Sequence, residues 1–158
     1  IISDVAVIPL PDFKQKMVQI GYLARTANLL GIATPKIACI APSEQLLPNV
    51  ISSTEGALLA KMADRGQLGN VVVDGPLSLD VAEHKKVRGS SVAGDPDCLL
   101  FPNIESANVF FKSVSHLCGG ELAAMVMGTK VPCVLTSRGD TSKTKLYSIA
   151  LACLAVKQ

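Results

Sequence analysis

Aromatic residues and net charge are both scarce in this sequence. It has no tryptophan, and its two tyrosines and four phenylalanines make up only 4% of the 158 residues. Lysine and arginine number 15 against 13 aspartates and glutamates, so the formal net charge at pH 7 is only +2. Nucleic-acid-binding surfaces combine clustered positive charge with aromatic side chains on which bases stack. The composition therefore argues against a DNA or RNA partner.

Long hydrophobic runs are also missing. No window approaches roughly 18 uninterrupted apolar residues, the length needed for a helix to cross a bilayer. The start of the chain lacks a basic segment and contains Asp4, so it does not resemble a secretory signal peptide. The sequence thus predicts a cytoplasmic protein without a membrane partner.

The chain also lacks the residue spacings of a metal site or a disulfide framework. Its cysteines are scattered and form no Cys-x-x-Cys pair: Cys39, Cys98, Cys118, Cys133 and Cys153. The two histidines, His84 and His116, have no cysteine partner at ligand spacing. We therefore expect no metal, and we expect the cysteines to be small buried residues in a reducing compartment.

Aliphatic residues are abundant instead. Hydrophobic residues make up 49% of the chain, and the mean hydropathy is +0.39. The excess consists of alanine, valine, leucine and isoleucine, which suits helices packed on a parallel sheet. It equally suits a chain that buries surface against a further domain or a second subunit.

Apolar stretches with strand and helix periods alternate along the chain. They predict strands at residues 4–8, 35–40, 70–74 and 97–101, and a hairpin of strands 123–127 and 132–136. Helical patterns occupy residues 14–30, 52–65, 81–86, 104–118 and 141–156. Glycines end several of these helices, and a capping box at 52–55 predicts the start of one. The order predicts a three-layer α/β fold in which helices flank a mostly parallel, mixed sheet.

Polar clusters follow three of the predicted strands. They are the Asp-Gly-Pro turn at 74–76, the segment 102–105, and residues 136–140. Ligands of open α/β sheets bind outside the carboxyl ends of the strands, so these clusters could converge on one crevice. Each also has a structural alternative, because Asp-Gly-Pro is a good turn and Asn103 can cap a helix.

The segment 134–140 is the most informative of the three. It predicts a buried strand, a polar turn and then the helix that begins near Thr141. A helix amino terminus attracts anions, and the guanidinium of Arg138 can grip a phosphate or carboxylate with two parallel hydrogen bonds. The alternative is an ordinary strand-to-helix turn with Asp140 or Thr141 as the N-cap.

Several long runs resemble the phosphate acetyltransferases and butyryltransferases, the phosphotransacylases. They are LAKMADRGQ at 59–67, VDGPLSLD at 73–80, VAGDPD at 92–97, LFPNIESAN at 100–108 and LTSRGD at 135–140. The resemblance covers essentially the whole chain. The Thr-Ser-Arg-x-Asp form, with Lys145 and the run 148–152 after it, is more similar to the butyryl branch than to the acetyl branch.

The resemblance implies the reaction acyl-CoA + phosphate ⇌ acyl phosphate + CoA, with CoA and phosphate as substrates and no cofactor. It implies the fold that phosphotransacylases share with isocitrate and isopropylmalate dehydrogenases. It also implies that residues 1–158 are only the carboxyl-terminal part of such an enzyme, since the family places its active site between two α/β domains. We expect this half to be inactive alone and the whole enzyme to be a homodimer.

Two junctions are shorter than the family pattern. They are 13/14 and 80/81, where we expect either loops that are missing from the sequence or a genuine shortening of the chain. Consecutive Cα atoms much farther apart than about 3.8 Å at either junction would be the sign of omitted residues.

The resemblance also assigns site residues. Arg138 is expected to hold the phosphate or acyl phosphate, and Ser137 to donate a hydrogen bond at the reacting centre. Thr144 occupies the position of the acetyl branch's aspartate and cannot act as a base, so Asp140 is our substitute for it. Four further candidates for substrate binding match a family motif near the cleft: Asn103, Glu105, Asn108 and Lys112. The polar clusters at the strand ends add Asp74, Gly75, Pro76 and Thr136.

Two other functions remain open. Phosphotransacylase-like domains also occur as regulatory domains, so the chain could be a non-catalytic module that senses acyl-CoA. It could also serve only for dimerisation, with the chemistry supplied by the other half. A dehydrogenase is disfavoured because the sequence has no Gly-x-Gly-x-x-Gly motif.

Overall fold

The computed structural model describes residues 1–85 and 87–156, which form two compact units. The first unit runs from Ile1 to Val109, and the second begins at Phe110. The four strands and most of the helices belong to the first unit, whereas the predicted hairpin at 123–136 falls in the second.

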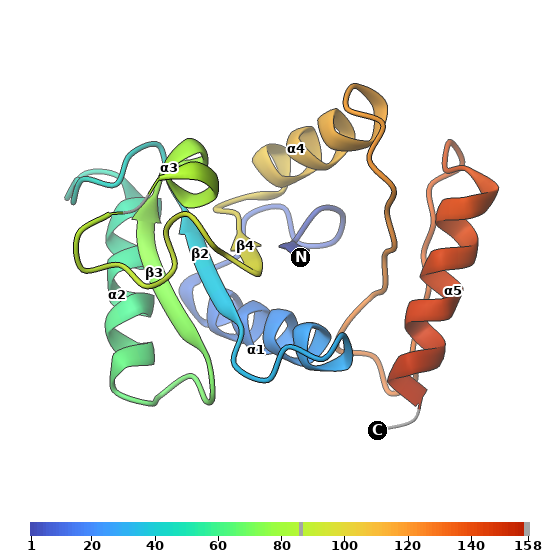
Figure 1. The fold of residues 1–158 in the computed structure, drawn as a ribbon, viewed down its shortest axis with the longest axis horizontal. Helices are drawn as coiled ribbons and strands as arrows, with labels where there is room; N and C mark the ends of the chain where they lie inside the picture. The colour runs from blue at the N-terminus through green and yellow to red at the C-terminus, as the bar shows by residue number, and fades with distance from the viewer. Residues whose placement is uncertain (86, 157–158) are drawn as a thin grey trace. The chain divides into compact units, whose positions relative to one another are not determined.

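A four-stranded parallel sheet with the order β1-β4-β2-β3 forms the centre of the first unit (Figure 1). Its strands are β1 (Ile2–Ser3), β2 (Lys36–Ile40), β3 (Val72–Leu77) and β4 (Cys98–Leu100). Ile37 in β2 pairs with both Val73 in β3 and Cys98 in β4, so β2 and β4 are the central strands. Helices flank this sheet, and the predicted α/β class is confirmed.

The helices follow the predicted order. They are α1 (Phe13–Leu29), α2 (Ile51–Asp64), α3 (Leu79–His84), α4 (Ile104–His116) and α5 (Ser142–Val156). Helix α2 packs mainly on β3, whereas α1 contacts β4 and β1. Helix α3 begins two residues before the predicted segment 81–86, and Lys86 lies outside the described residues.

The core of the first unit joins one face of α1 to the sheet. Ile20, Leu23 and Ala27 repeat at helical spacing on α1 and are almost completely buried. They pack in one cluster with residues of β2, β3 and β4 and with Leu59 of α2. Burial of each large aliphatic side chain contributes about 1.5–3 kcal/mol, so this face holds α1 on the sheet.

The predicted strand at 4–8 is wrong. The strand is Ile2–Ser3, and the chain then turns because the Asp4 carboxylate accepts hydrogen bonds from three successive amides. These donors are the backbone N–H groups of Ala6, Val7 and Ile8, at 2.9, 3.1 and 2.8 Å. A side chain that satisfies local amides in this way competes with strand pairing.

The predicted capping box at 52–55 is also wrong. Helix α2 begins at Ile51, and its N-cap Val50 has no side chain that can accept a hydrogen bond. Ser53 turns back instead: its Oγ accepts from the Leu47 amide and donates to the Gln45 carbonyl.

A capping box does occur at the start of α1. The Asp12 carboxylate accepts from the Gln15 amide at 2.7 Å, and the Gln15 side chain accepts from the Asp12 amide at 2.8 Å. The pair satisfies two amides that would otherwise lack partners at the helix start.

The predicted turn at 74–76 is part of a strand. Strand β3 continues through Gly75 and Pro76 to Leu77. Gly75 lies so close to β2 that a Cβ atom there would be only 2.6 Å from the Cβ of Cys39. The glycine therefore permits close strand packing here, and it does not end the strand.

Replacing Gly75 by alanine is expected to lower the free energy of unfolding by about 2–3 kcal/mol, because the new methyl group overlaps Cys39. Chemical denaturation of the Gly75→Ala variant would measure this loss. Gly21→Ala is the matched control, because no atom lies within 4 Å of a Cβ in that α1 position. The control should be stabilised by about 0.5–1 kcal/mol, and equal effects in the two variants would contradict the packing argument.

The second unit contains the end of α4, an extended segment and α5. The predicted hairpin is reduced to one antiparallel bridge, between Val126 and Cys133, and the described residues form no strands around it. This bridge lies outside the parallel sheet. In the described part of the chain, no helix has both the length and the apolar character required to span a membrane.

The prediction that the cysteines are buried holds for only some of them. Cys39 and Cys98 lie in the core of the first unit. Cys118 and Cys153 are exposed in the second unit, and Cys133 is partly exposed. All five are free thiols.

Candidate functional site

The polar turn before α5 brings two of the predicted catalytic residues together. The Ser137 amide donates to Oδ2 of Asp140 at 2.6 Å, and the Asp140 amide donates to the Ser137 carbonyl at 3.1 Å. These two bonds close a tight loop around Arg138 and leave the Ser137 side chain exposed. Thr136, which precedes the loop, is partly buried.

Arg138 lies at the tip of this loop and is exposed. Within the described residues, its guanidinium makes no hydrogen bond or ion pair. All five of its N–H donors are therefore available to a ligand. A guanidinium in this state is suited to bidentate binding of a phosphate.

The cap of α5 is Thr141 and not Asp140. The Thr144 amide donates to Oγ1 of Thr141 at 3.1 Å, which is the usual N-cap contact. The alternative role of Asp140 as the cap is thus excluded, although its carboxylate still holds the loop.

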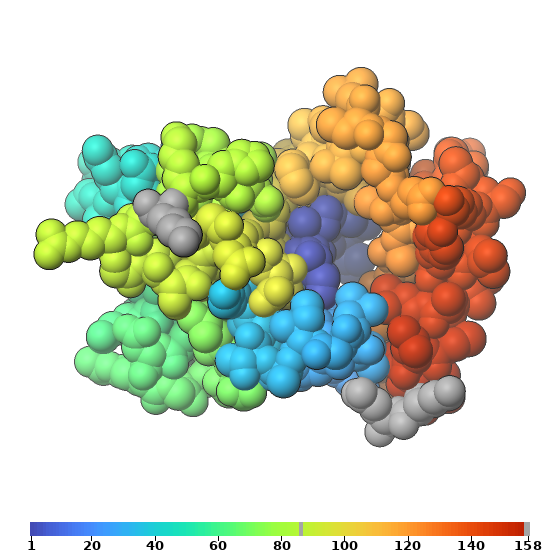
Figure 2. Space-filling model, in the orientation of Figure 1, coloured from blue at the N-terminus to red at the C-terminus, as the bar shows by residue number. Residues whose placement is uncertain are grey.

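The second predicted group, Asp74 to Pro76, lines a surface hollow of about 170 Å³ in the first unit. Arg88 and Ser90 contribute to the other wall of this hollow. They belong to the segment after α3, which lies on the outside of the unit (Figure 2). Oδ1 of Asp74 accepts a hydrogen bond from the Gly75 amide at 2.8 Å, so one of the two carboxylate oxygens is bound to the adjacent backbone.

Two of the predicted residues on α4 have structural roles. Asn103 caps the helix by accepting a hydrogen bond from the Ser106 amide at 2.9 Å, which confirms the alternative considered above. Asn108 donates from Nδ2 to the Val5 carbonyl at 2.8 Å and so fixes the loop that follows β1. Neither residue lines the hollow at Asp74.

The charged residues of α4 remain candidates. Glu105 is exposed in the first turn of the helix. Lys112, in the second unit, has its ammonium 5.2 Å from the ring centroid of Phe111. That contact is a cation–π interaction and leaves the ammonium donors free to bind an anion.

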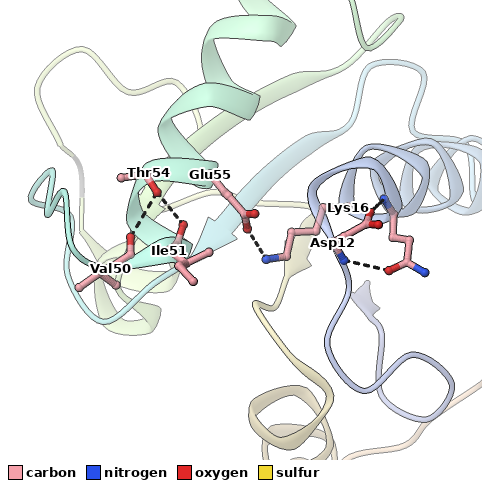
Figure 3. A network of polar contacts seen from close by, with 7 residues as sticks. Asp12, Lys16, Val50, Ile51, Thr54 and Glu55 are labelled. Atoms are coloured by element: carbon pink, nitrogen blue, oxygen red, sulfur yellow. Dashed lines mark hydrogen bonds and ion pairs between the residues drawn. The ribbon is translucent and has the colours of Figure 1, made fainter.

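The sequence did not predict an ion pair in the first unit between a buried lysine and a partly buried glutamate. Lys16 on α1 donates to Glu55 on α2, and Figure 3 shows the two side chains extending toward one another. The sequence does indicate that Lys16 is buried. Lys16 precedes Ile20 by four residues and Leu23 by seven, which places it on the buried face of α1. A charged residue within the apolar stripe of a helix indicates that its charge has a specific partner.

Two side chains of the first unit have shifted pKa values that limit their use as nucleophiles or as proton donors and acceptors. Burial raises the pKa of the Cys39 thiol to about 12, so this thiol stays protonated and is not a nucleophile near neutral pH. Hydrogen bonds from Lys85 and Ser78 lower the pKa of the exposed Asp80 carboxyl to about 2. Neither group is poised to exchange a proton near pH 7.

Known proteins match this chain over almost its whole length. The family model described as "Phosphate acetyl/butaryl transferase" matches residues 1–153. The chain is 42% identical to a phosphate acetyltransferase from Thermotoga maritima, with 96% of this chain and 53% of the relative covered. It is also 42% identical to a phosphate butyryltransferase from Clostridium acetobutylicum, with 97% and 52% covered.

A solved structure agrees with these relatives. The branched-chain phosphotransacylase from Enterococcus faecalis superposes with a TM-score of 0.87 at 31% identity, over 98% of this chain and 57% of that one. The chain spans about half the length of the curated relatives it matches. On this sequence and structural similarity, the chain belongs to the phosphate acetyl/butyryl transferase family.

Proposed function

We propose that this chain is the carboxyl-terminal part of an acyltransferase that moves an acyl group between CoA and inorganic phosphate. Similarity to enzymes named for this transfer, over nearly the whole chain, is the observation that carries the proposal. The exposed Arg138, which has no bonding partner among the described residues, supports it, because an anion-binding group is available in one of the matched motifs.

The proposed chemistry needs no metal or redox cofactor. A phosphate oxygen attacks the thioester carbonyl, and the CoA thiolate leaves. Arg138 holds the phosphate against the carbonyl, and the Ser137 hydroxyl donates a hydrogen bond to the oxyanion that develops. In the reverse direction Asp140 accepts the proton of the CoA thiol.

Substrate binding is proposed for eight further residues. They are Asp74, Gly75, Pro76, Asn103, Glu105, Asn108, Lys112 and Thr136. Asn103 and Asn108 would act on the substrate only indirectly, because their side chains already bind backbone groups. For the acyl group we propose butyryl or a short branched chain, following the Thr-Ser-Arg-x-Asp motif at 136–140.

A further domain is proposed to precede this chain in the whole enzyme, with loops also missing at junctions 13/14 and 80/81. The relatives' greater length supports the domain. Helix α5 supports it as well, since Leu146, Ile149 and Val156 are all more than half exposed although they are apolar. Such a helix needs a cover, which the preceding domain or a second copy in a cytoplasmic homodimer would provide.

Replacing Asp140 by asparagine tests its role as the base. An asparagine oxygen can still accept the hydrogen bond from the Ser137 amide, so the loop should keep its shape while the carboxylate is lost. We expect the rate of thiol-dependent acyl transfer to fall by about 100-fold, the usual contribution of general base catalysis. An unchanged rate with a lower melting temperature would restrict Asp140 to holding the loop.

The function itself is tested by thiol release from butyryl-CoA and acetyl-CoA in the full-length protein, with and without inorganic phosphate. We expect release that depends on phosphate and is faster with butyryl-CoA. Binding of CoA without phosphate-dependent release would overturn the proposal and favour the acyl-CoA-sensing module.

A further inference from the structure

The ion pair between Lys16 and Glu55 lies where a ligand of an α/β sheet would bind. It borders a small hollow that also includes Ile40 and Leu100, the last residues of the two central strands β2 and β4. Ligands of open α/β sheets bind outside these carboxyl ends. The other candidate residues described above do not line this hollow.

Lys16 is unusual for its burial. Only 6% of its side chain is exposed, and no other charged residue is buried among residues 1–85 and 87–156. Removing an ammonium from water costs several kcal/mol, and a buried ion pair often contributes no more stability than an apolar pair of the same size. A buried lysine at this position therefore points to a role other than stability.

The Lys16 ammonium has N–H donors that remain available for a ligand. An ammonium has three N–H donors, and within the described chain the one acceptor is Glu55, whose side chain is 21% exposed. Glu55 thus supplies the counter-charge of the ammonium while no ligand is present. The two remaining donors can bind oxygens of an anion that enters from the open side.

We propose that Lys16 binds a phosphoryl group of one of the two substrates at the carboxyl ends of β2 and β4. This inference rests on the proposed function, which supplies two sources of that group: inorganic phosphate and the phosphates of CoA. Glu55 is a positioning residue in this site, because it acts through Lys16.

The experiment measures KM for each substrate in the full-length enzyme carrying Lys16→Met. Loss of a charge-assisted hydrogen bond should raise KM about tenfold for the substrate whose phosphoryl group Lys16 binds. A rise confined to inorganic phosphate identifies that source, and a rise confined to acyl-CoA identifies the CoA phosphates. Unchanged KM values for both substrates in a folded variant would overturn the proposal.

Lys36→Met is the matched control. Lys36 also makes one ion pair, with Asp95 at 2.7 Å, but it lies at the start of β2, at the end of the strand opposite to the proposed site. Its loss should leave both KM values unchanged. If Lys16→Met does not fold, Lys16→Gln removes the charge but can still hydrogen-bond to Glu55, and unchanged KM values in that folded variant would equally overturn the proposal.

A second readout separates this inference from the proposed function. Inorganic phosphate and CoA are added separately to the wild-type protein, and the melting temperature is recorded. The ligand that Lys16 binds should raise it, and Lys16→Gln should lose most of that rise. This difference in melting temperature is expected even if the protein catalyses no acyl transfer. An equal rise in the wild type and in the Lys16 variant would overturn the role of Lys16.

Discussion

Replacing Arg138 by alanine should abolish most of the phosphate-dependent acyl transfer while leaving the fold intact. Its exposed guanidinium makes no bond to the described part of the chain, so its removal leaves no buried partner unsatisfied. Loss of a group that stabilises charge in the transition state typically costs 100-fold or more, and we expect a fall of about 100- to 1000-fold in kcat/KM. Steady-state kinetics with phosphate as the varied substrate would measure it.

Two further variants define what Arg138 contributes. Arg138→Lys retains the charge without the planar fork, and it should recover only a small part of the activity. Arg25→Ala removes an exposed arginine from α1 and should have no effect on kcat/KM. Activity in Arg138→Ala close to that of the wild type would remove Arg138 from the site.

The largest expected effect on stability comes from removing Glu55. In Glu55→Leu the Lys16 ammonium would remain buried without a counter-charge. Breaking a buried pair in this way costs about 3 kcal/mol, and chemical denaturation would show the loss. The double variant Lys16→Met/Glu55→Leu should recover to within about 1 kcal/mol of the wild type, because both charges are then gone.

An exposed ion pair supplies the comparison for this experiment. Lys61 and Asp64 on α2 are 3.2 Å apart, and both side chains are more than 60% exposed. Asp64→Ala should change stability by less than about 0.5 kcal/mol. A loss in Glu55→Leu that is no larger, or a double variant as unstable as the single one, would show that burial of Lys16 is not the cause.

The helices could be predicted from the sequence because the patterns that specify them, apolar periodicity and the residues at each end, lie within or next to each helix. The apolar stripe of α1 and the glycine that follows it bound that helix to within a residue at each end. Helices α4 and α5 were predicted for the same reason. The family relationship was also visible in contiguous motifs, such as 73–80 and 100–108, without any knowledge of the fold.

The strand ends depended on contacts distant in sequence. Gly75 and Pro76 have the composition of a turn, yet they lie in β3 because the glycine fits against Cys39 on the neighbouring strand. Residues 4–8 have the composition of a strand, yet Asp4 binds their amides. Local propensity is weak enough for such contacts to override it.

The sequence by itself determined the α/β class, the order of the helices and the family, because periodicity and contiguous motifs encode them. The role of Arg138 stays a prediction from one of those motifs. Only the tertiary structure showed that Asn103 and Asn108 serve the backbone, and that Ser137 and Asp140 close a loop. It alone brought Lys16 and Glu55 together, since they are 39 residues apart. Side-chain pairing and burial depend on how helices pack on a sheet, and no local pattern specifies that packing.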